Sequence, residues 1–411
     1  MSEVPTQMSE LPIQTSEVPT QMSELPIQTS EVPTQTSELP IQTSELPTQM
    51  SELPKLRSEI DSLDDELLRL LNQRARVSRK IGDTKRAEDP AAPVYRAERE
   101  AAVLRRLEAA NAGPLPNDAV SRIFHEVMSA SSALQRAIRV AYLGPAGTFS
   151  EAAAVRQFGH SAIAVPCANF DEAFRRTETG ETDFSVVPVE NSTEGTISRV
   201  LDLLLNSPLK VCAEVVVRVQ QNLMRARAGS DGITKVYSHG QSLAQTQGWL
   251  NRNLPGVDRV TVESNAEAAR LASLDQSTAA IAGLNAAEKY ALQVLAPNIE
   301  DDPTNRTRFM VIGHVESAPS GRDRTWLVMS APNVAGGLVK LLAPFAQHGV
   351  SMTKIESRPA RLASMPGSWE YMFYVDVEGH RADPAVATAL AELKSIAPYL
   401  KLFGSYPVGD Y

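Results

Sequence analysis

The chain has 411 residues, 43% of them hydrophobic, and a net charge of −9 at pH 7, which suits a globular protein of two to four domains. The first fifty residues hold seven glutamates and no lysine or arginine, so the rest of the chain has a net charge of only −2. That remainder offers no broad basic field for nucleic acid or a membrane surface. Two cysteines, no apolar run of about 18 residues and no secretory signal favour a cytoplasmic protein without disulfides or a metal cluster.

A seven-residue repeat occupies the N-terminal segment. Every copy, from SEVPTQM onward, contains a proline, and proline at that frequency removes helix hydrogen bonds, which argues against a coiled coil. We predict that residues 1–53 are disordered. The repeats either bind a partner or are an expansion without function, and we favour the second interpretation.

An amphipathic helix is predicted from about Leu56 to Thr84. Apolar residues recur at three- and four-residue spacing and mark a buried face, yet Arg74 lies within this stripe and Lys85 follows one step past its end. A cation in a packed seam is costly unless a negative group meets it, and the stripe contains no acid. The counter-charge therefore comes from a neighbouring helix, another chain or an anionic ligand. For Arg74 alone, a structural salt bridge explains the pattern as well as a ligand does.

Two further helices, at about 97–110 and 118–137, complete a helical region over residues 54–137. Three such helices bury little apolar surface, so we expect an obligate dimer. Arg74 and Lys85 lie about 16 Å apart along the axis and within about 20° of each other, so they could hold opposite ends of a small dianion. Arg57 is roughly 25 Å and roughly 100° from Arg74, so it could reach only the site of a partner subunit.

Between residues 138 and 318, short apolar runs alternate with helical ones, which predicts an α/β fold with mostly parallel strands. The expected strands are 140–143, 162–165, 184–189, 211–219, 235–237, 260–262 and 279–282. Ligands of such folds gather beyond the carboxyl ends of strands, where this chain has polar clusters at 144–150, 190–193, 238–241 and 305–308. Singly these clusters are weak signals, because Ser150 could simply cap a helix and His239 could be a structural histidine.

Residues in the three predicted helices match a known family. They are Leu56-Arg57, Ile60-Asp61-Ser62-Leu63-Asp64, Leu70-Leu71-Asn72-Gln73-Arg74, Lys85, Arg99-Glu100, Ser131 and Gln135. This set resembles the all-helical class of chorismate mutase, an interlocked dimer whose active site borrows one arginine from the other subunit. The aspartate that some relatives place before the Arg-Glu pair has no assigned counterpart in Tyr95-Arg96-Ala97-Glu98.

The resemblance implies a role for each matching residue. Arg57 from the partner and Arg74 would clamp the carboxylates of chorismate. Lys85 and Gln135 would bond its ether oxygen, and Glu100 its ring hydroxyl. Arg99 and Ser131 would orient the substrate. Such a set suits a pericyclic rearrangement, which needs a held conformation and cations where negative charge grows.

Three motifs follow in order, GPAGTFSEAA (144–153), VPVENSTEGTI (187–197) and NRTRF (305–309). Together they resemble prephenate dehydratase, which has two α/β lobes similar to type-2 periplasmic binding proteins and an active site between them. The reaction expels carbon dioxide and hydroxide, so an acid must assist the leaving hydroxyl. The resemblance assigns that role to Thr307 and a substrate carboxylate to Arg308. The pocket would be lined by Thr148, Asn191, Ser192, Thr193, Ser238 and Gln241.

Residues 322–411 follow the order strand, helix, strand, strand, helix, strand. The expected strands are 325–330, 352–357, 371–377 and 400–403, and the expected helices are 337–348 and 384–396. The order resembles the α+β fold of an ACT regulatory domain, whose phenylalanine-binding motif matches Glu356-Ser357-Arg358-Pro359. The second motif of that family, Gly-Ala-Leu-Val, reads Gly336-Gly337-Leu338-Val339 here.

These resemblances imply a bifunctional enzyme that converts chorismate to prephenate and then to phenylpyruvate. We expect a homodimer or higher homo-oligomer, inhibition by phenylalanine, and no metal or cofactor. One alternative is a ligand-binding regulator whose active sites have decayed, but Lys85, Glu100, Thr307 and Arg308 are all present. A dehydrogenase in place of the dehydratase would need a G-x-G-x-x-G loop, which residues 144–150 do not supply.

Overall fold

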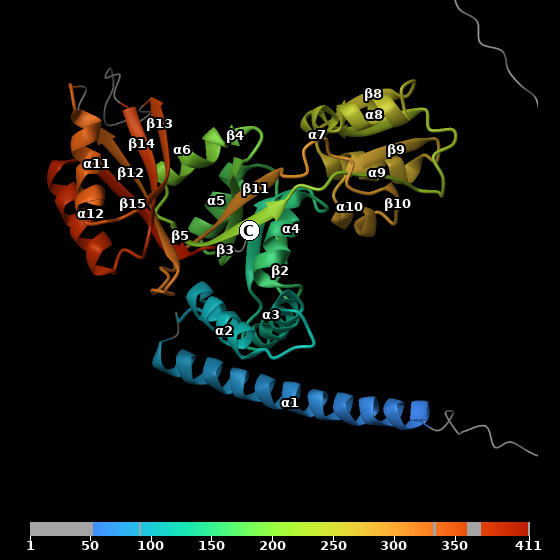
Figure 1. Ribbon diagram of the computed structural model, residues 1–411, viewed down its shortest axis with the longest axis horizontal. Coiled ribbons are helices and arrows are strands. Elements are labelled where there is room, and N and C mark those ends of the chain that lie inside the picture. Colours follow the sequence, from blue (N-terminus) through green and yellow to red (C-terminus); the bar gives the residue numbers. More distant parts are fainter. Residues whose placement is uncertain (1–51, 90–91, 332–333, 360–370, 410–411) are drawn as a thin grey trace, which may run out of the picture. The chain divides into compact units, whose positions relative to one another are not determined.

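The computed structural model describes residues 52–89, 92–331, 334–359 and 371–409 (Figure 1). Backbone contacts divide the chain into two units, Met1–Asp61 and Ser62–Tyr411, with the boundary inside the first helix. The predicted disorder of the N-terminal repeats lies outside the described residues, except that Glu52 and Leu53 already belong to this helix. None of the described helices is long and apolar enough to cross a membrane.

The helical region contains α1 (Glu52–Glu88), α2 (Ala97–Ala110) and α3 (Asn117–Ala133). The predicted burial of the apolar stripe of α1 is wrong for the single chain, because Leu63 is 58% and Val77 52% exposed. The contacts between α1 and α3 are made instead by polar residues, such as Arg74 with Ser131. Within the described residues, most of the stripe is therefore left exposed to solvent.

The first lobe is built on a mixed sheet of six strands, in the order β2-β1-β3-β11-β5 with β4 paired to β3. Its strands are β1 (Arg139–Leu143), β2 (Ile163–Cys167), β3 (Phe184–Asn191), β4 (Gly195–Thr196), β5 (Lys210–Arg218) and β11 (Arg306–Gly313). The helices α4 (Phe149–Phe158), α5 (Phe170–Glu178) and α6 (Ser198–Asn206) belong to the same lobe. Strand β3 is central and almost wholly buried, which agrees with its continuous apolar run.

The second lobe, drawn in yellow in Figure 1, has a five-stranded sheet in the order β10-β6-β9-β7-β8. Its strands are β6 (Asn222–Arg225), β7 (Lys235–His239), β8 (Asp258–Val262), β9 (Thr278–Ala282) and β10 (Gln293–Ala296). Its helices are α7 (Gly240–Gln245), α8 (Gln247–Asn253), α9 (Asn265–Leu274) and α10 (Leu284–Lys289). The chain enters this lobe after β5 and returns to the first lobe at β11.

The prediction of mostly parallel strands is wrong. Parallel pairs join β1 to β2 and β3, and β7 to β8 and β9, but β11 runs antiparallel to both β3 and β5, and β6 runs antiparallel to β9 and β10. The reason is that the chain crosses between the lobes twice. It leaves the first lobe at the end of β5 and returns at the start of β11, so these two neighbouring strands run in opposite directions. A single pass of alternating apolar runs cannot show this reversal.

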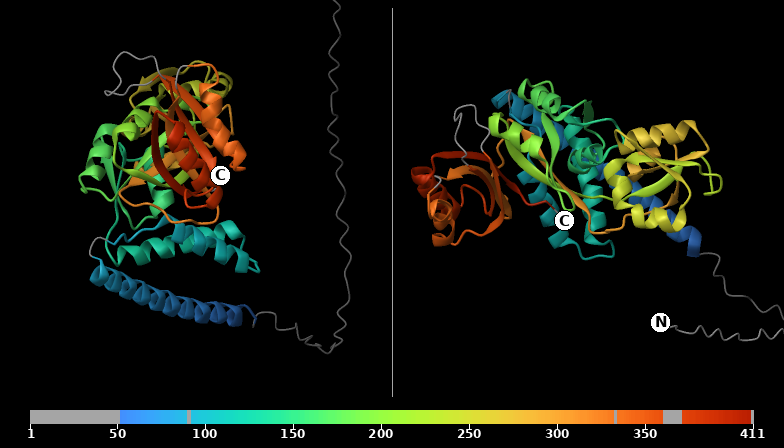
Figure 2. Two further views of the ribbon diagram at one scale, coloured as in Figure 1. Left: turned by 90° about the vertical axis from the view of Figure 1, so that its left-hand side faces the viewer. Right: turned by 90° about the horizontal axis from the view of Figure 1, so that it is seen from above.

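The C-terminal domain has the predicted order of elements, with an antiparallel sheet β13-β14-β12-β15. The elements are β12 (Asp323–Ala331), α11 (Gly337–Gln347), β13 (Met352–Pro359), β14 (Tyr371–Glu378), α12 (Pro384–Ile396) and β15 (Tyr399–Pro407). Both helices cover one face of the sheet (Figures 1 and 2), where Leu327 and Val375 are buried against them. The other face presents Trp326, Tyr374 and Phe403 to the core of the first lobe.

Strand β15 approaches the first lobe closely at Gly404. A Cβ atom at this position would lie 2.1 Å from the carbonyl oxygen of Val211 on β5, which is far inside van der Waals contact. The obstacle is backbone, so no change of rotamer could relieve the clash. Glycine at residue 404 is therefore required for this packing.

We expect Gly404→Ala to destabilise the protein by at least about 1–3 kcal/mol, because β15 and β5 must separate to accept the methyl group. A thermal unfolding curve followed by near-ultraviolet circular dichroism measures the loss. Gly256→Ala is the matched control, since nothing lies within 4 Å of a Cβ there. Equal unfolding temperatures for the two variants would contradict the close packing.

Candidate active sites

The first cavity, of about 810 Å³, is lined by α1, α2, α3 and the segment before α2. Four cations and two acids line it, namely Arg74, Lys85, Arg96, Arg99, Glu98 and Glu100. The excess of positive charge suits an anionic ligand. All of the lining residues lie beyond Asp61, whereas Arg57 belongs to the other unit.

Arg74 donates hydrogen bonds to Ser131 Oγ (2.7 Å) and to the carbonyl oxygen of Val127 (3.4 Å). Burial lowers the pKa of its guanidinium, which remains charged at neutral pH. Among the described residues, no carboxylate forms an ion pair with Arg74 or Lys85. In this part of the chain, a salt bridge to a neighbouring helix therefore does not neutralise the two cations. The remaining sources of a counter-charge are another chain and an anionic ligand.

Gln135, in the turn after α3, reaches the same cavity because its side chain packs against Gly82 of α1. A Cβ at residue 82 would lie 2.7 Å from Gln135 Cγ, so only glycine leaves room for this side chain. Gln135 Nε2 donates to Ser78 Oγ (2.9 Å), which leaves its amide oxygen for other partners. The sequence reasoning found Gln135 and Ser131 but missed Ser78 and Gly82, which hold them.

Glu100 forms an ion pair with His125 of α3, with 2.7 Å between Oε1 and Nδ1. Burial alone lowers the pKa of His125, but the hydrogen bond and negative charge of Glu100 outweigh it and raise the pKa above 6.5. This pairing could not be predicted from the sequence, because His125 is 25 residues from Glu100 and lies on another helix. Glu98, also missed, is buried in the cavity with one carboxylate oxygen lacking a hydrogen-bond partner among the described residues.

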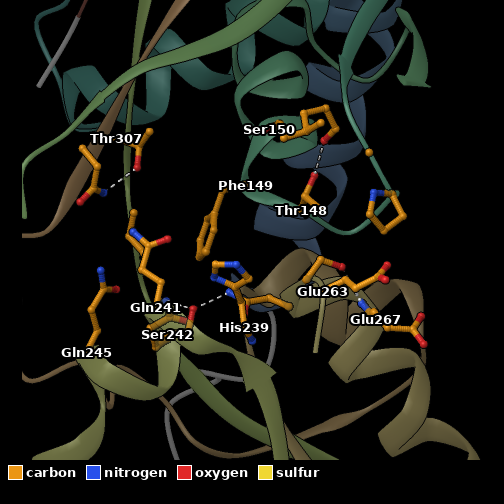
Figure 3. Close-up of a pocket in the computed structure, with 18 of the residues that line it drawn as sticks. Thr148, Phe149, Ser150, His239, Gln241, Ser242, Gln245, Glu263, Glu267 and Thr307 are labelled. Carbon is orange, nitrogen blue, oxygen red and sulfur yellow. Dashed lines mark hydrogen bonds between the residues drawn. The ribbon is translucent and has the colours of Figure 1, made fainter. Parts of the chain in front are cut away.

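The second cavity, of about 490 Å³, lies between the two lobes at the carboxyl ends of β3, β7 and β8 (Figure 3). Its polar residues are Thr148, Ser150, Asn191 and Thr307 from the first lobe, Gln221 from a crossing segment, and His239, Gln241, Ser242, Gln245, Glu263, Ser264, Asn265 and Glu267 from the second. Figure 3 shows the aromatic ring of Phe149 between Thr307 and His239. No lysine or arginine lines this cavity among the described residues.

Asn191 and Thr307 are opposite each other on β3 and β11, and Asn191 Nδ2 donates to Thr307 Oγ1 at 3.0 Å. The orientation of this amide is fixed, because its oxygen accepts from the backbone amides of Thr193 (3.0 Å) and Glu194 (3.1 Å). Thr307 Oγ1 is therefore an acceptor from Asn191, and its own proton is free to be donated into the cavity.

Side chains of the crossing segment and the second lobe leave unused hydrogen-bonding atoms around the same cavity. Gln221 Nε2 donates to Ser242 Oγ (2.9 Å), but the amide oxygen of Gln221 and Nε2 of Gln245 are buried without a partner among the described residues. Such groups are costly unless a ligand satisfies them. Asn265 donates to Ser242 Oγ (2.8 Å), and Ser238 in turn donates to Asn265 Oδ1 (2.9 Å).

The cavity brings together Thr148, Asn191, Gln241 and Thr307 from the predicted set, but Ser192, Thr193 and Ser238 do not line it. Ser192 accepts from the backbone amide of Arg306 (2.9 Å), and Ser238 is buried behind Asn265. These three residues support the cavity through its backbone and neighbouring side chains. Gln245 and Asn265, which the sequence reasoning missed, follow strands β7 and β8 and could have been found from that position.

Arg308 requires a correction. It does not line the second cavity, because successive side chains of β11 point to opposite faces and Thr307 occupies the cavity face. Its guanidinium contacts Asp376 Oδ2 (2.5 Å) and Glu214 Oε2 (3.2 Å) instead. The predicted contact of Arg308 with a substrate carboxylate is therefore abandoned.

The two expected phenylalanine motifs lie on different elements of the C-terminal domain. On β13, Glu356 accepts from Thr196 Oγ1, and Arg358 pairs with Asp202 (3.2 Å), so both side chains face the first lobe. Ser357 points to the opposite face of β13, where it is exposed. The second motif, residues 336–339, lies at the start of α11.

Comparison with known proteins agrees with this arrangement. Three family descriptions match the chain, Chorismate mutase type II over residues 56–136, Prephenate dehydratase over 140–317 and ACT domain over 325–395. The bifunctional chorismate mutase/prephenate dehydratase of Neisseria gonorrhoeae is 50% identical over 347 residues, which are 84% of this chain and 94% of the relative. The enzyme of the same name from Stutzerimonas stutzeri is 45% identical over 348 residues, with the same shares. This chain belongs to the bifunctional chorismate mutase/prephenate dehydratases.

A solved structure supports the dehydratase assignment of the two lobes and C-terminal domain. The prephenate dehydratase of Arthrobacter aurescens in complex with L-Phe has a TM-score of 0.60 and 35% identity, over 66% of this chain and 90% of that chain. Nearly all residues of the first cavity belong to the range that matches chorismate mutase, and all residues of the second to the range that matches prephenate dehydratase, so we call them the mutase pocket and the dehydratase pocket. No described residue lines both.

The pairing of His125 with Glu100 predicts a pH-dependent stability of the mutase region. Because the folded pKa of His125 is raised, the pairing stabilises the fold fully below about pH 6.5, and this stabilisation is lost as pH rises through the folded pKa. His125→Gln should therefore lower the unfolding temperature at pH 6 and change it much less at pH 9. His160→Gln, which removes a mostly exposed pairing with Glu126, is the control. A difference from wild type that grows with pH would contradict this interpretation.

Proposed function

We propose that this chain rearranges chorismate to prephenate in the mutase pocket and converts prephenate to phenylpyruvate in the dehydratase pocket, with inhibition by phenylalanine bound to the C-terminal domain. The observation that carries the proposal is the presence of two separate pockets, each built from residues that match its own family. The unpaired cations of the first pocket and the Asn191–Thr307 pair of the second suit the two reactions.

In the mutase pocket, the enzyme has to hold chorismate folded so that the two ends of the rearranging system meet. Arg74 and Lys85 bring positive charge that the described residues leave unmatched. The two carboxylates of chorismate and the negative charge that develops on its ether oxygen can provide the missing counter-charge. Gln135 adds a neutral donor or acceptor beside Lys85. Glu100, oriented by His125, accepts from the ring hydroxyl.

Dimerisation follows from the exposed stripe of α1. Leu63, Leu67, Leu70, Val77 and Ile81 are each 46–58% exposed, which is unusual for leucine, valine and isoleucine repeated along one helix face. Burial of such a stripe against the same stripe of a second copy would remove it from water. An antiparallel arrangement brings Arg57 of the partner subunit to the pocket that contains Arg74, as the family resemblance implies.

Subunits that carry Arg57→Ala and subunits that carry Arg74→Ala should each lose mutase activity by about 10²-fold or more, since removing a charged partner costs about 2–5 kcal/mol. Mixing them should restore activity, because a mixed dimer has one site with both arginines. Statistical exchange would return about a quarter of the wild-type sites. Dehydratase activity, assayed with prephenate, serves as the folding control. Failure of the mixture to recover any activity would argue against a shared site.

In the dehydratase pocket, one carbon–carbon bond and one carbon–oxygen bond break as the ring becomes aromatic. The carboxylate on the ring leaves as carbon dioxide, and its bonding electrons expel the ring hydroxyl, which departs as water once it has received a proton. Thr307 is the proposed proton donor, and the N–H of Asn191 steadies the negative charge that grows on its oxygen. The N-terminus of α4 and the free Nε2 of Gln245 offer donors to the remaining carboxylate.

Thr307→Val should reduce phenylpyruvate formation by about 10²–10⁴-fold, because valine keeps the shape but has no proton to donate. Prephenate should then accumulate in an assay that starts from chorismate. Thr304→Val is the control, since Thr304 is exposed and does not line the pocket. Loss of both activities in Thr307→Val would refute the separation of the two sites.

A further inference from the structure

Strands β3 and β11 present the dehydratase pocket on one face and the C-terminal domain on the other. Asn191 and Thr307 are paired in register and line the pocket, whereas their neighbours Glu190 and Arg308 are also paired in register but line a different cavity of about 410 Å³. This division follows from the alternation of side chains along a strand. Each pocket residue thus has an immediate neighbour that faces the C-terminal domain.

Both of these neighbours form ion pairs with that domain. Lys354 Nζ of β13 lies 2.9 Å from Glu190 Oε2, and Arg308 Nη2 lies 2.5 Å from Asp376 Oδ2 of β14. Lys354 and Asp376 are themselves partners in the register of β13 and β14. Two adjacent residues of one sheet are therefore joined to two adjacent residues of the other, directly behind the pocket.

The Arg308 contact is buried, which makes it stiff. The side chain of Asp376 is 1% exposed and that of Glu214 is 0%, and Arg308 also donates to the hydroxyl of Tyr406 (2.9 Å). A buried network of charges does not loosen gradually, because separating one pair leaves a charge without compensation. Movement of β14 relative to the first lobe must therefore move β11 with it or break the network.

The second ion pair lies next to the expected phenylalanine motif. Lys354 is two residues before Glu356, so both side chains point to the first lobe. Glu356 accepts from Thr196, and Thr196 is the register partner of Glu190. Strand β13 thus contacts β3, which carries Asn191, and β4, which pairs with it, at the point where the motif begins.

We propose that the Lys354–Glu190 and Asp376–Arg308 ion pairs form the link through which the C-terminal domain sets the positions of Asn191 and Thr307. Glu190, Arg308, Lys354 and Asp376 are positioning residues, which act on the reaction through the two pocket residues beside them. A shift of β13 and β14 on phenylalanine binding moves β3 and β11 and changes the Asn191–Thr307 hydrogen bond. This link rests on the proposed function, since it needs both phenylalanine binding and prephenate conversion.

The test compares two substitutions that each remove one lysine from the same interface. Lys354→Met breaks the pair behind the pocket. Lys401→Met, at the other edge of the sheet, removes contacts with the carbonyl oxygens of Leu204 (2.9 Å) and Ser207 (2.7 Å), which flank no pocket residue. For each full-length variant, one measures phenylalanine binding by calorimetry, the phenylalanine concentration that halves dehydratase activity, and mutase activity as a check of folding.

Lys354→Met should bind phenylalanine with nearly unchanged affinity yet need at least about fivefold more of it for half inhibition, the lower end of usual coupling strengths. Lys401→Met should keep the wild-type relation between binding and inhibition. The double exchange Glu190→Lys with Lys354→Glu should restore part of the inhibition, which a merely structural role would not predict. Asp376→Asn should lower kcat for prephenate more than it changes KM, because Thr307 is displaced while binding groups remain.

The outcomes separate the link from the proposed function. A wild-type enzyme that converts prephenate but is not inhibited by phenylalanine overturns the proposed regulation, and the link with it. A wild type that is inhibited, together with Lys354→Met inhibited at the same concentration, overturns the link alone. Equal loss of inhibition in Lys354→Met and Lys401→Met also overturns it, since any damage to the interface would then suffice.

Discussion

The pairing of β3 with β11 is the contact on which the dehydratase half of this protein depends. It holds Asn191 against Thr307 at 3.0 Å, and by alternation it turns Glu190 and Arg308 to the opposite face of the same sheet. The pocket and the C-terminal domain are therefore separated by the thickness of a single sheet. A displacement of Glu190 or Arg308 on one face is therefore passed through the backbone to Asn191 or Thr307 on the other.

Charge is handled in two contrasting ways in this chain. Arg308 is buried with Asp376 and Glu214, so its positive charge is matched within the protein and contributes to structure. Arg74 and Lys85 line a cavity in which the described residues provide no ion pair for them. The buried ion pairs of Arg308 hold two domains together, whereas cations without an ion-pair partner can attract an anionic ligand. Sequence alone does not separate the two cases, because Arg74 and Arg308 both lie beside apolar residues.

The elements were largely predictable because their periodicity is local. Helix α2 and helix α12 begin and end at the predicted residues, and the strands of the C-terminal domain are found with longer ends. Strand β11 was not among the predicted strands, and its antiparallel direction depends on the return of the chain from the second lobe. The face to which Arg308 points is set by the same strand, and for that reason Arg308 was wrongly assigned to the substrate. His125 was missed because its partner Glu100 is on another helix.

The way the chain crosses between the lobes bears on how the dehydratase pocket can close. One crossing follows β5 and the other ends at Asn305, and they are tied together where Gln221 accepts from Ile299 (2.8 Å) and where Val219 donates to Asn305 (2.9 Å). Thr307 comes only two residues after the second crossing. A hinge rotation of one lobe against the other would therefore reach Thr307, the proposed proton donor, within two residues, and would couple enclosure of a substrate to the position of this side chain.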